Sequence, residues 1–560
     1  MHDAGINGKL WRQFQTMHAG LTRRVIHPVG LTEPFDVERG VAQGAVESPW
    51  IYSIFIDGLA KELKRAGLGI MIAGRRVPLL MYADDVVLLA STQSELEAMN
   101  AIVTDFAHRN RFEYNGKKSG VMAFNVSAAA LQKVKTTAWV LSGKAVKVVD
   151  AYTYLGTVTE TKGHGGDWSA HVLDIIGRAK RRSNDLLYMC RYDRGMCPRT
   201  AATLWKSLVR PILEYASEIW SGQIPRHLQQ KAEGVQLKFL RGTLGLHKNG
   251  SGVTNEALRA EVGCERLQDR WTKLRLGYWR RVFSAPRGRL LRDVVEFRRR
   301  EWIASTGKGW GSRGWVGTVK TSLDLHGLGK FWTDPVAAAA TPSDRWKKIV
   351  YKAVDYRSDA DRANTLAGKP SALTYTGIKE WGENPKNYSF SVGEIGRLGQ
   401  HVPERYLDDR SNLKGTRLKM LCRLGCLPLV DRVGREARPP WPREYRTCPV
   451  CCNGCIEDIH HFVMECPKYE SKRTALLQQA VRVLAKADGE VTATGFAVMP
   501  SRDQLAVLLG RRISDPMAEN RLDRNVKRFL SKCWNLRGEV TGALNDALFT
   551  SYGIYSALAA

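Results

Sequence analysis

Residues 78–92, PLLMYADDVVLLAST, constrain the fold of this 560-residue chain more than any other segment, because they place two adjacent carboxylates between two apolar runs. Short apolar runs rich in Val and Leu predict buried strands, whereas Asp is depleted in strands and enriched in turns. We therefore expect residues 77–82 and 86–90 to pair as a hairpin, with Asp84 and Asp85 at its tip.

The carboxylate pair indicates more than a polar turn, although a polar turn is the simpler alternative. The tip is preceded by Tyr82 and Ala83, where a two-residue hairpin usually has Gly. Adjacent carboxylates also repel each other unless a cation lies beside them. Mg²⁺ held by one or two carboxylates and by substrate phosphates is the usual arrangement in phosphoryl transfer. The pair therefore predicts a Mg²⁺ site.

The surrounding segments predict helices and strands in alternation. Residues 46–63 and 94–106 carry apolar side chains at helical spacing. Residues 121–124 and 153–158 predict further short strands, so an α/β or α+β layer is expected. From residue 167 the pattern becomes mainly helical. One late apolar stripe predicts a core-facing helix and comprises Leu522, Val526, Phe529, Leu530 and Trp534.

The chain is strongly basic, with 85 Lys and Arg against 56 Asp and Glu and a formal net charge of +29. A positive field of this size favours polyanionic partners. No apolar run reaches the roughly 18 residues that span a membrane, and the first residues lack the layout of a signal peptide. We therefore expect an intracellular protein without a membrane partner.

The motif YADD between apolar runs resembles the central motif of reverse transcriptases, in particular those of LINE-type non-LTR retrotransposons. Residues 35–63 resemble the motif of this family that packs against template and incoming nucleotide. The matching residues there are Gln43, Gly44, Ser48 and Pro49. NGKKSGVMAF is similar to the next palm motif, with Asn115, Lys118 and Ser119 in place. YTYLG resembles the turn that grips the primer end, and RPILEYASEIW resembles the helical thumb.

The resemblance implies an α+β fold built around a partial right-hand polymerase palm, which is an antiparallel sheet with helices. It also implies a helical thumb, a basic helical connector, a small zinc knuckle-like module and a helical C-terminal tail. The expected boundaries are residues 1–160 for the palm, 161–247 for the thumb, 248–438 for the connector, 439–475 for the zinc module and 476–560 for the tail.

The activity implied by the resemblance is RNA-directed DNA polymerisation, with an RNA template, a DNA primer or target and deoxynucleoside triphosphates as partners. Asp84 is the implied principal Mg²⁺ ligand in a two-metal site and Asp85 the weaker one. Lys118 is the implied donor to the leaving pyrophosphate, with a solvated surface lysine as the alternative. The implied substrate- and template-binding residues are Gln43, Gly44, Ser48, Pro49, Tyr82, Tyr154, Leu155, Gly156, Arg178, Lys180, Arg181 and Arg182. The expected location is nuclear when genomic DNA is the target and cytoplasmic otherwise.

One part of the family pattern is not found in this sequence. The family needs a further carboxylate on a strand upstream of the segment that GINGKLW resembles, together with finger segments. We therefore expect an N-terminally truncated copy whose activity alone is weak or absent. The alternative function is that of a catalytically dead, zinc-containing nucleic-acid-binding protein. An RNA-dependent RNA polymerase fits the segments after Gly156 less well.

Five of the 11 cysteines crowd into residues 448–466, which does not look like a disulfide framework. Cys448, Cys451, His461 and Cys466 have the spacing of a closed structural Zn²⁺ site. The alternatives are His460, Cys452 or Cys455 as ligands, or reduced cysteines without metal. The similarity of HFVMECP to the C-terminal Cys-Cys-His-Cys segment of the same retroelements favours His461 and Cys466, and nucleic acid as the partner.

Two further stretches combine basic and aromatic residues. GRAKRRS places Arg178, Lys180, Arg181 and Arg182 on one helix, where the thumb is expected to lie along a duplex. Residues 271–283, WTKLRLGYWRRVF, interleave aromatic and basic side chains. Such side chains bind phosphates and stack on bases, but we expect the Trp residues to belong to the core and the basic residues to form a solvated face.

Overall fold

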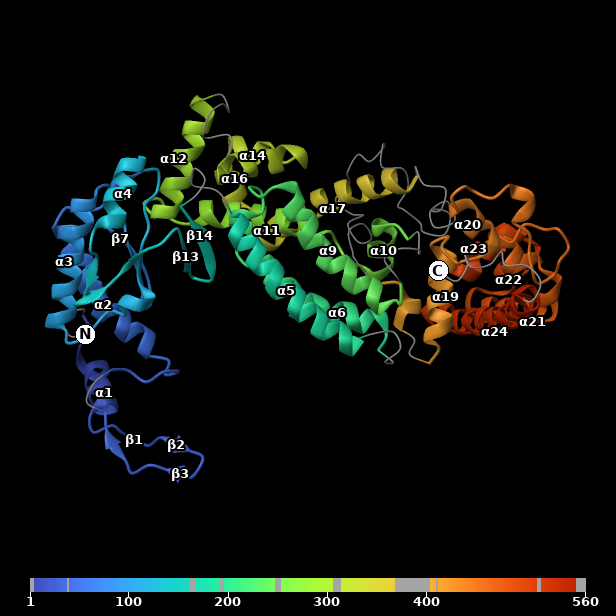
Figure 1. Ribbon diagram of the computed structural model, residues 1–560, viewed down its shortest axis with the longest axis horizontal. Helices are drawn as coiled ribbons and strands as arrows, with labels where there is room; N and C mark the ends of the chain where they lie inside the picture. Colours follow the sequence, from blue (N-terminus) through green and yellow to red (C-terminus); the bar gives the residue numbers. More distant parts are fainter. Residues whose placement is uncertain are drawn as a thin grey trace. The chain divides into compact units, whose positions relative to one another are not determined.

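The computed structural model describes residues 5–37, 40–161, 168–190, 196–246, 253–305, 314–367, 403–408, 411–510 and 515–549. The chain divides into two compact units, Met1–His171 with Arg287–Thr306 and Val172–Pro286 with Gly307–Ala560. Figure 1 shows the helices and strands of both units. Residues 368–402 of the expected connector lie outside the described residues.

The first unit combines short strands with helices. It begins with α1 (Gly8–His18), β1 (Thr22–Arg23), β2 (Ile26–His27), β3 (Gly30–Leu31) and β4 (Phe35–Asp36). Next come α2 (Ser48–Arg65), β5 (Ile70–Ile72), β6 (Arg75–Val77), β7 (Leu79–Tyr82), β8 (Asp85–Leu88) and α3 (Gln93–Arg109). The remaining elements are η2 (Gly116–Lys118), β9 (Gly120–Val121), α4 (Ala128–Thr136), β10 (Val140–Leu141), β11 (Lys144–Ala145), β12 (Lys147–Val148), β13 (Ala151–Tyr154), β14 (Thr157–Glu160) and, from later in the chain, α12 (Leu290–Ala304).

Within the described residues, the strands form two-stranded sheets only. β9 and β12 pair in parallel, and the other pairs are antiparallel: β1–β4, β2–β3, β5–β6, β7–β8, β10–β11 and β13–β14. The structure thus agrees with an α+β fold, but it has separate ribbons where the resemblance implied one antiparallel sheet. Strands of two to four residues form few ladder bonds, and such ribbons need helices against them to be stable.

The core of the first unit lies between α2 and α3, and both predicted helices are confirmed. Leu59 and Leu63 of α2 meet Met99 and Val103 of α3, and Leu79 of β7 is buried with them. α3 begins cleanly because the Thr92 side chain accepts a hydrogen bond from the Glu95 backbone N–H. This packing anchors the base of the β7–β8 hairpin against the helices.

Glu95 connects two loops of the first unit to the start of α3. Its carboxylate accepts hydrogen bonds from the backbone N–H groups of Gly69, at 2.6 Å, and Ser91, at 2.7 Å. These two bonds lower the pKa of Glu95, because they stabilise its charged form. The segment before β5 and the segment after β8 are therefore attached to the start of α3.

The second unit is mostly helical. It contains most of α5 (Ser169–Cys190), then α6 (Pro198–Leu208), α7 (Arg210–Glu214), α8 (Ser217–Trp220), α9 (Arg226–Thr243), α10 (Asn255–Val262), α11 (Leu267–Ser284), α14 (Trp315–Leu325), α15 (Lys330–Thr333), α16 (Pro335–Ala340) and α17 (Ser343–Ala367). The C-terminal part contains η5 (Arg405–Asp408), α19 (Leu413–Arg423), α20 (Val430–Glu436), η6 (Arg443–Tyr445), η7 (His461–Glu465), η8 (Pro467–Tyr469), α21 (Glu470–Asp488), α22 (Glu490–Val498), α23 (Ser501–Leu509) and α24 (Pro516–Phe549).

Helix α11 corrects one expectation from the sequence. Trp271 and Trp279 are buried, as predicted. Lys273 and Arg275, however, are buried too rather than part of a solvated basic face. Lys273 Nζ lies 2.5 Å from carboxylate oxygens of Glu265 and of Asp355. Arg275 donates hydrogen bonds of 2.9 Å to the Ser221 and Ser322 hydroxyls. Because both side chains are buried and have partners inside the helical core, Lys273 and Arg275 are not available to nucleic acid.

The predicted apolar stripe of α24 is confirmed. Leu522, Val526, Phe529 and Leu530 are buried, and the ring centroids of Trp534 and Phe462 lie 6.1 Å apart.

Among the helices in the described ranges, none combines the length and the apolar character needed to cross a membrane.

Candidate functional site

The β7–β8 hairpin presents the carboxylate pair at the surface. Tyr82 pairs with Asp85, so the loop consists of Ala83 and Asp84 alone. The sequence predicts both carboxylates at the tip of the hairpin. In the structure only Asp84 lies in the loop, and Asp85 is the first residue of β8. Ala83 has a φ of 52°, a left-handed conformation that two-residue hairpin loops require and that costs a non-Gly residue about 1–2 kcal/mol. Both carboxylates are exposed.

Two tyrosines from different elements lie within electrostatic reach of the pair. Burial raises the pKa of Tyr52 on α2, and the charge of Asp84 raises it further. Burial likewise raises the pKa of Tyr154 on β13, with a contribution from Asp85. Each carboxylate thus has its own neighbouring phenol, and both phenols stay protonated at neutral pH.

The residues that match the upstream motif lie in the loop before α2 and in its first turn. Gln43 and Gly44 are exposed, and Gly44 has a φ of 88°, which favours glycine. The Ser48 hydroxyl donates a hydrogen bond of 2.6 Å to the Ala42 carbonyl, which closes the loop. Pro49 lies in the first turn of α2, where its missing N–H has no cost. Ser48 and Pro49 therefore shape the loop that presents Gln43 and Gly44.

The next motif forms the short turn η2. The Asn115 side chain accepts hydrogen bonds from the backbone N–H groups of Lys117 and Lys118. The Tyr152 hydroxyl donates to the Lys118 carbonyl, which ties this turn to β13. The Lys118 side chain itself is exposed, so its ammonium group is free to meet an anionic ligand.

The YTYLG segment forms the β13–β14 hairpin. Its loop residues Leu155 and Gly156 both have positive φ, 47° and 73°, the pattern of a type I′ turn.

In the second unit, the basic residues predicted on one helix all lie on α5, and all are exposed. They are Arg178, Lys180, Arg181 and Arg182.

The carboxylate pair suits a hard cation that keeps other ligands. In the described part of the chain, three or more Cys, His, Asp or Glu ligand atoms gather at one place only, and this group does not include Asp84 or Asp85. Mg²⁺ usually binds one or two carboxylates and completes its shell with water and substrate phosphates. Two adjacent exposed carboxylates fit that role.

The one group of metal-ligand side chains consists of Cys448, Cys451, His461 and Cys466, whose ligand atoms lie within 4.8 Å of one another. Cys451 Sγ and His461 Nε2 are 3.5 Å apart. A tetrahedral Zn²⁺ site, with Zn–S of about 2.3 Å and Zn–N of about 2.0–2.1 Å, places its ligand atoms roughly 3.5–3.8 Å apart. The four buried side chains fit Zn²⁺ without an open coordination position.

The alternative ligands lie outside this group. Cys452 and Cys455 are exposed, and the ring of His460 contacts Ser501 Oγ at 2.8 Å and Glu465 at 3.0 Å. Burial raises the pKa of the Cys448 thiol to about 12 and raises the pKa of Cys466 as well. A bound cation reverses this shift, because coordinating thiols are deprotonated.

Surrounding contacts fix the Cys/His loop in place. The His461 backbone N–H donates to Asp458 at 2.8 Å. Glu457, fully buried, accepts two hydrogen bonds from Arg537 of α24, at 2.7 and 2.8 Å. Phe462 packs against Tyr469 with ring centroids 5.3 Å apart. The loop is therefore part of the C-terminal helical core.

Comparisons with known proteins match the segment that holds the carboxylate hairpin. Residues 5–159 match the family model described as reverse transcriptase (RNA-dependent DNA polymerase). This segment is a reverse transcriptase domain of the non-LTR retrotransposon type. It contains the carboxylate hairpin, the loop before α2 and the η2 turn.

The relatives that this chain matches come from retrotransposable elements. A 115 kDa protein of the type-1 element R1DM of Drosophila melanogaster is 25% identical over 257 residues, 44% of this chain and 23% of its own length. The RNA-directed DNA polymerase from the mobile element jockey of Drosophila funebris is 23% identical over 215 residues, 37% of this chain and 22% of its own. A Pol polyprotein of the type-1 element R2 of Popillia japonica is 32% identical over 95 residues, which are 17% of this chain and 13% of its own length. The chain therefore spans less than a quarter of each relative's length.

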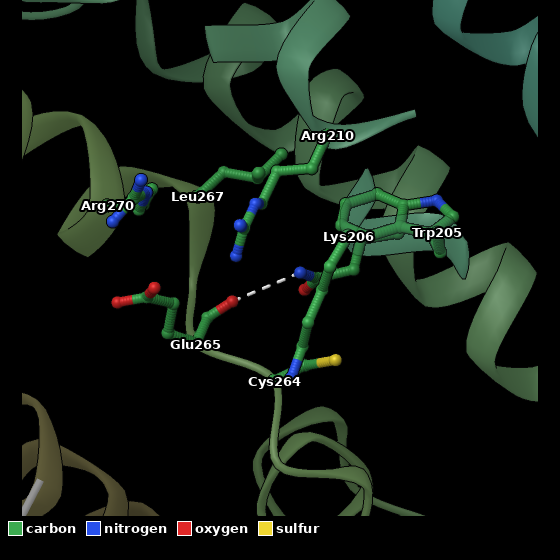
Figure 2. A pocket seen from close by; sticks show the side chains of 8 residues that line it. Trp205, Lys206, Arg210, Cys264, Glu265, Leu267 and Arg270 are labelled. Atoms are coloured by element: carbon green, nitrogen blue, oxygen red, sulfur yellow. Dashed lines mark hydrogen bonds between the residues drawn. The ribbon is translucent and has the colours of Figure 1, made fainter. Parts of the chain in front are cut away.

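A small pocket in the second unit is a weaker candidate for a site. Figure 2 shows Lys206, Arg210 and Arg270 around the same space as Glu265. Its volume of about 10 Å³ is about that of one water position. The cations already have partners, since Lys206 donates to the Gly263 carbonyl at 2.6 Å and Arg270 to Glu214 at 2.8 Å. We interpret the pocket as a packing gap.

Sequence reasoning missed the residues that support these sites. In the sequence, Tyr52 is one of several aromatic residues in a predicted amphipathic helix, and Glu95 is an acidic residue near the start of another. Neither pattern indicates a role in the site. Glu457 and Arg537 are separated by 80 residues. A signal exists only for Glu95, which stands three residues after the N-cap Thr92, as in a capping box.

Proposed function

We propose that this chain carries out nucleotidyl transfer onto a DNA 3′-hydroxyl with an RNA template, and that Asp84 and Asp85 are its metal-binding carboxylates. The observation that carries the proposal is the hairpin of a matched reverse transcriptase domain that exposes two adjacent carboxylates on an anchored base. Asp84 and Asp85 would hold a divalent metal, which would supply charge neutralisation for the transferring phosphoryl group and activation of the attacking hydroxyl.

Each matched residue has a role consistent with its position. Gly44 lets the backbone approach a nucleotide where a Cβ would intrude, since no protein atom lies within 4 Å of the position that a Cβ would take, and this space is open to a ligand. Lys118, exposed at the end of η2, supplies a positive charge to the leaving pyrophosphate. Tyr154 with Leu155 and Gly156 forms the turn that contacts the primer end, whereas Tyr82 ends β7 in the carboxylate hairpin, where it pairs with Asp85.

The proposed partners are an RNA template, a DNA primer or target and deoxynucleoside triphosphates. The net charge of +29 and the exposed basic stretch of α5 support a polyanionic partner. Zn²⁺ held by the four Cys and His residues would stabilise the C-terminal helices rather than take part in chemistry. We propose a nuclear location during action on genomic DNA and a cytoplasmic one otherwise.

Primer extension with Mg²⁺ tests the proposal. The zinc-loaded chain is mixed with an oligo(dT)-primed poly(rA) template, and dTTP incorporation is measured for wild type, Asp84→Asn and Asp85→Asn. Asp57→Asn is the matched control, because Asp57 is a half-exposed carboxylate of α2 that pairs with Lys61. We expect weak, Mg²⁺-dependent incorporation that both hairpin variants abolish and the control retains. Incorporation that persists in Asp84→Asn contradicts the assignment.

A second function is nucleic-acid binding without catalysis. It is favoured by one observation: within the described residues, no third metal-ligand side chain gathers with Asp84 and Asp85. In that case wild type and Asp84→Asn bind an RNA–DNA duplex with equal affinity, and neither extends a primer. The two functions are thus separated by measuring binding and extension on the same preparations.

A further inference from the structure

A group of arginines on the first unit lies outside the short motifs that resemble the reverse transcriptase family, although Arg75 falls within the matched residues 5–159. Arg75 belongs to β6, and Arg287 and Arg289 precede α12, more than two hundred residues later in the chain. Figure 1 draws α12 in yellow-green and the N-terminal elements of the same unit in blue. The fold therefore assembles this group from two distant segments of one unit.

Arg75 makes the contact that brings the two segments together. Its Nη1 donates a hydrogen bond of 2.5 Å to the Gly288 carbonyl and lies 3.4 Å from Asp293. The Gly288 backbone N–H in turn donates to Asp293 at 3.3 Å. Because Gly288 stands between Arg287 and Arg289, these bonds hold both flanking arginines near Arg75, at the start of β6.

The positive charge of this group is not neutralised. Arg287 and Arg289 are exposed, and neither forms an ion pair within the described residues. Asp293 is the acid that the Arg75 contact brings to the group, and it already interacts with Arg75 and Gly288. The Arg75 side chain remains half exposed. Three guanidinium groups beside one carboxylate leave a net charge of +2.

We infer that Arg75, Arg287 and Arg289 form a binding surface for nucleic-acid phosphodiester groups on the reverse transcriptase unit. Guanidinium groups suit this ligand, because their planar donors match phosphate oxygens in pairs. The surface deepens the proposed function and rests on it, since it gives the template or primer strand a second area of contact. Phosphate contacts of this kind position a strand without reading its sequence.

The test measures duplex affinity as a function of salt. Fluorescence anisotropy follows a labelled RNA–DNA duplex bound by wild type and by Arg287→Gln/Arg289→Gln. Each lost phosphate contact lowers the slope of log Kobs against log[salt] by about 0.9, so the double variant is expected to lose about 1.8. Arg298→Gln/Arg300→Gln is the matched control, because it removes the same charge from exposed α12 residues that already pair with Glu301 and Glu296.

The outcomes separate the inference from the function it rests on. A slope loss confined to Arg287→Gln/Arg289→Gln, with unchanged circular dichroism, supports the surface. An equal loss in the control pair shows a general charge effect and overturns it. If wild type binds the duplex and the double variant binds it equally well, the surface fails alone. If wild type does not bind, the proposed function fails with it. Inorganic phosphate that competes no better than chloride of equal ionic strength identifies a polymeric ligand.

Discussion

The carboxylate hairpin and the Cys/His loop are built in opposite ways. Asp84 and Asp85 are exposed on a ribbon with a left-handed alanine in its loop, and within the described residues no third ligand gathers with them. The four Cys and His side chains are buried, close together and braced by α24. A site left open to solvent can accept a substrate with its metal, whereas a closed site can only hold its metal.

The comparison predicts that the two regions respond differently to the loss of a ligand. Loss at the closed site leaves buried thiols and a buried imidazole without their cation, so stability falls. Loss of a carboxylate at the open site removes a solvated charge and relieves the repulsion between Asp84 and Asp85. The stability of the fold therefore hardly changes, whereas the binding of metal and substrate does. Three substitutions and one metal-binding measurement test this contrast, from the largest effect on stability to the smallest.

Cys466→Ser is expected to have the largest effect. Structural Zn²⁺ contributes roughly 10–16 kcal/mol of binding free energy in small zinc-dependent folds, which is as large as the whole stability of a typical domain. We predict loss of bound zinc and unfolding of α21 and α24, measured by metal content and circular dichroism. Cys452→Ser, in the same loop but exposed, should change neither. A folded, zinc-free Cys466→Ser protein would break the comparison.

Glu457→Gln is expected to cost about 3–5 kcal/mol, because it leaves the largely buried Arg537 guanidinium without its carboxylate. The measurement is the urea midpoint of zinc release to a chromophoric chelator. Arg435→Gln is the control, since it removes the half-exposed partner of an ion pair on α20, for which a change below about 1 kcal/mol is expected. Equal midpoints for the two variants would show that α24 does not brace the site.

Glu95→Gln tests the base of the open hairpin and depends on pH. The folded-state pKa of Glu95 is lowered, so its contribution is complete above its unfolded-state pKa of about 4.3 and is lost as pH falls through the folded value. At pH 7 we expect a local loss of about 2 kcal/mol, or roughly 30-fold faster hydrogen exchange in peptides around Gly69 and Ser91. Once the pH falls below the folded-state pKa of Glu95, wild type and variant should converge. A difference that persists there would point to a cause other than the charge.

Much of both sites follows from local sequence, and the rest depends on contacts between distant residues. Apolar runs around Asp84 and Asp85 predict the hairpin, and cysteine spacing predicts which side chains share a metal. Local patterns do not show that Lys273 turns inward, because its partner Asp355 lies 82 residues away. They also do not show that Arg75 meets Gly288, 213 residues later. Nor do they predict the left-handed Ala83, which the register of β7 and β8 imposes.

Binding of Mn²⁺, followed by electron paramagnetic resonance, tests the central contrast most directly. The zinc-loaded chain is titrated in the presence of primer–template and nucleotide, as wild type, Asp84→Asn and Asp85→Asn. The account predicts Mn²⁺ binding that each variant abolishes, with zinc content at one per chain and thermal stability within about 0.5 kcal/mol of wild type. Unchanged Mn²⁺ binding in Asp84→Asn, or release of zinc from it, would contradict the account.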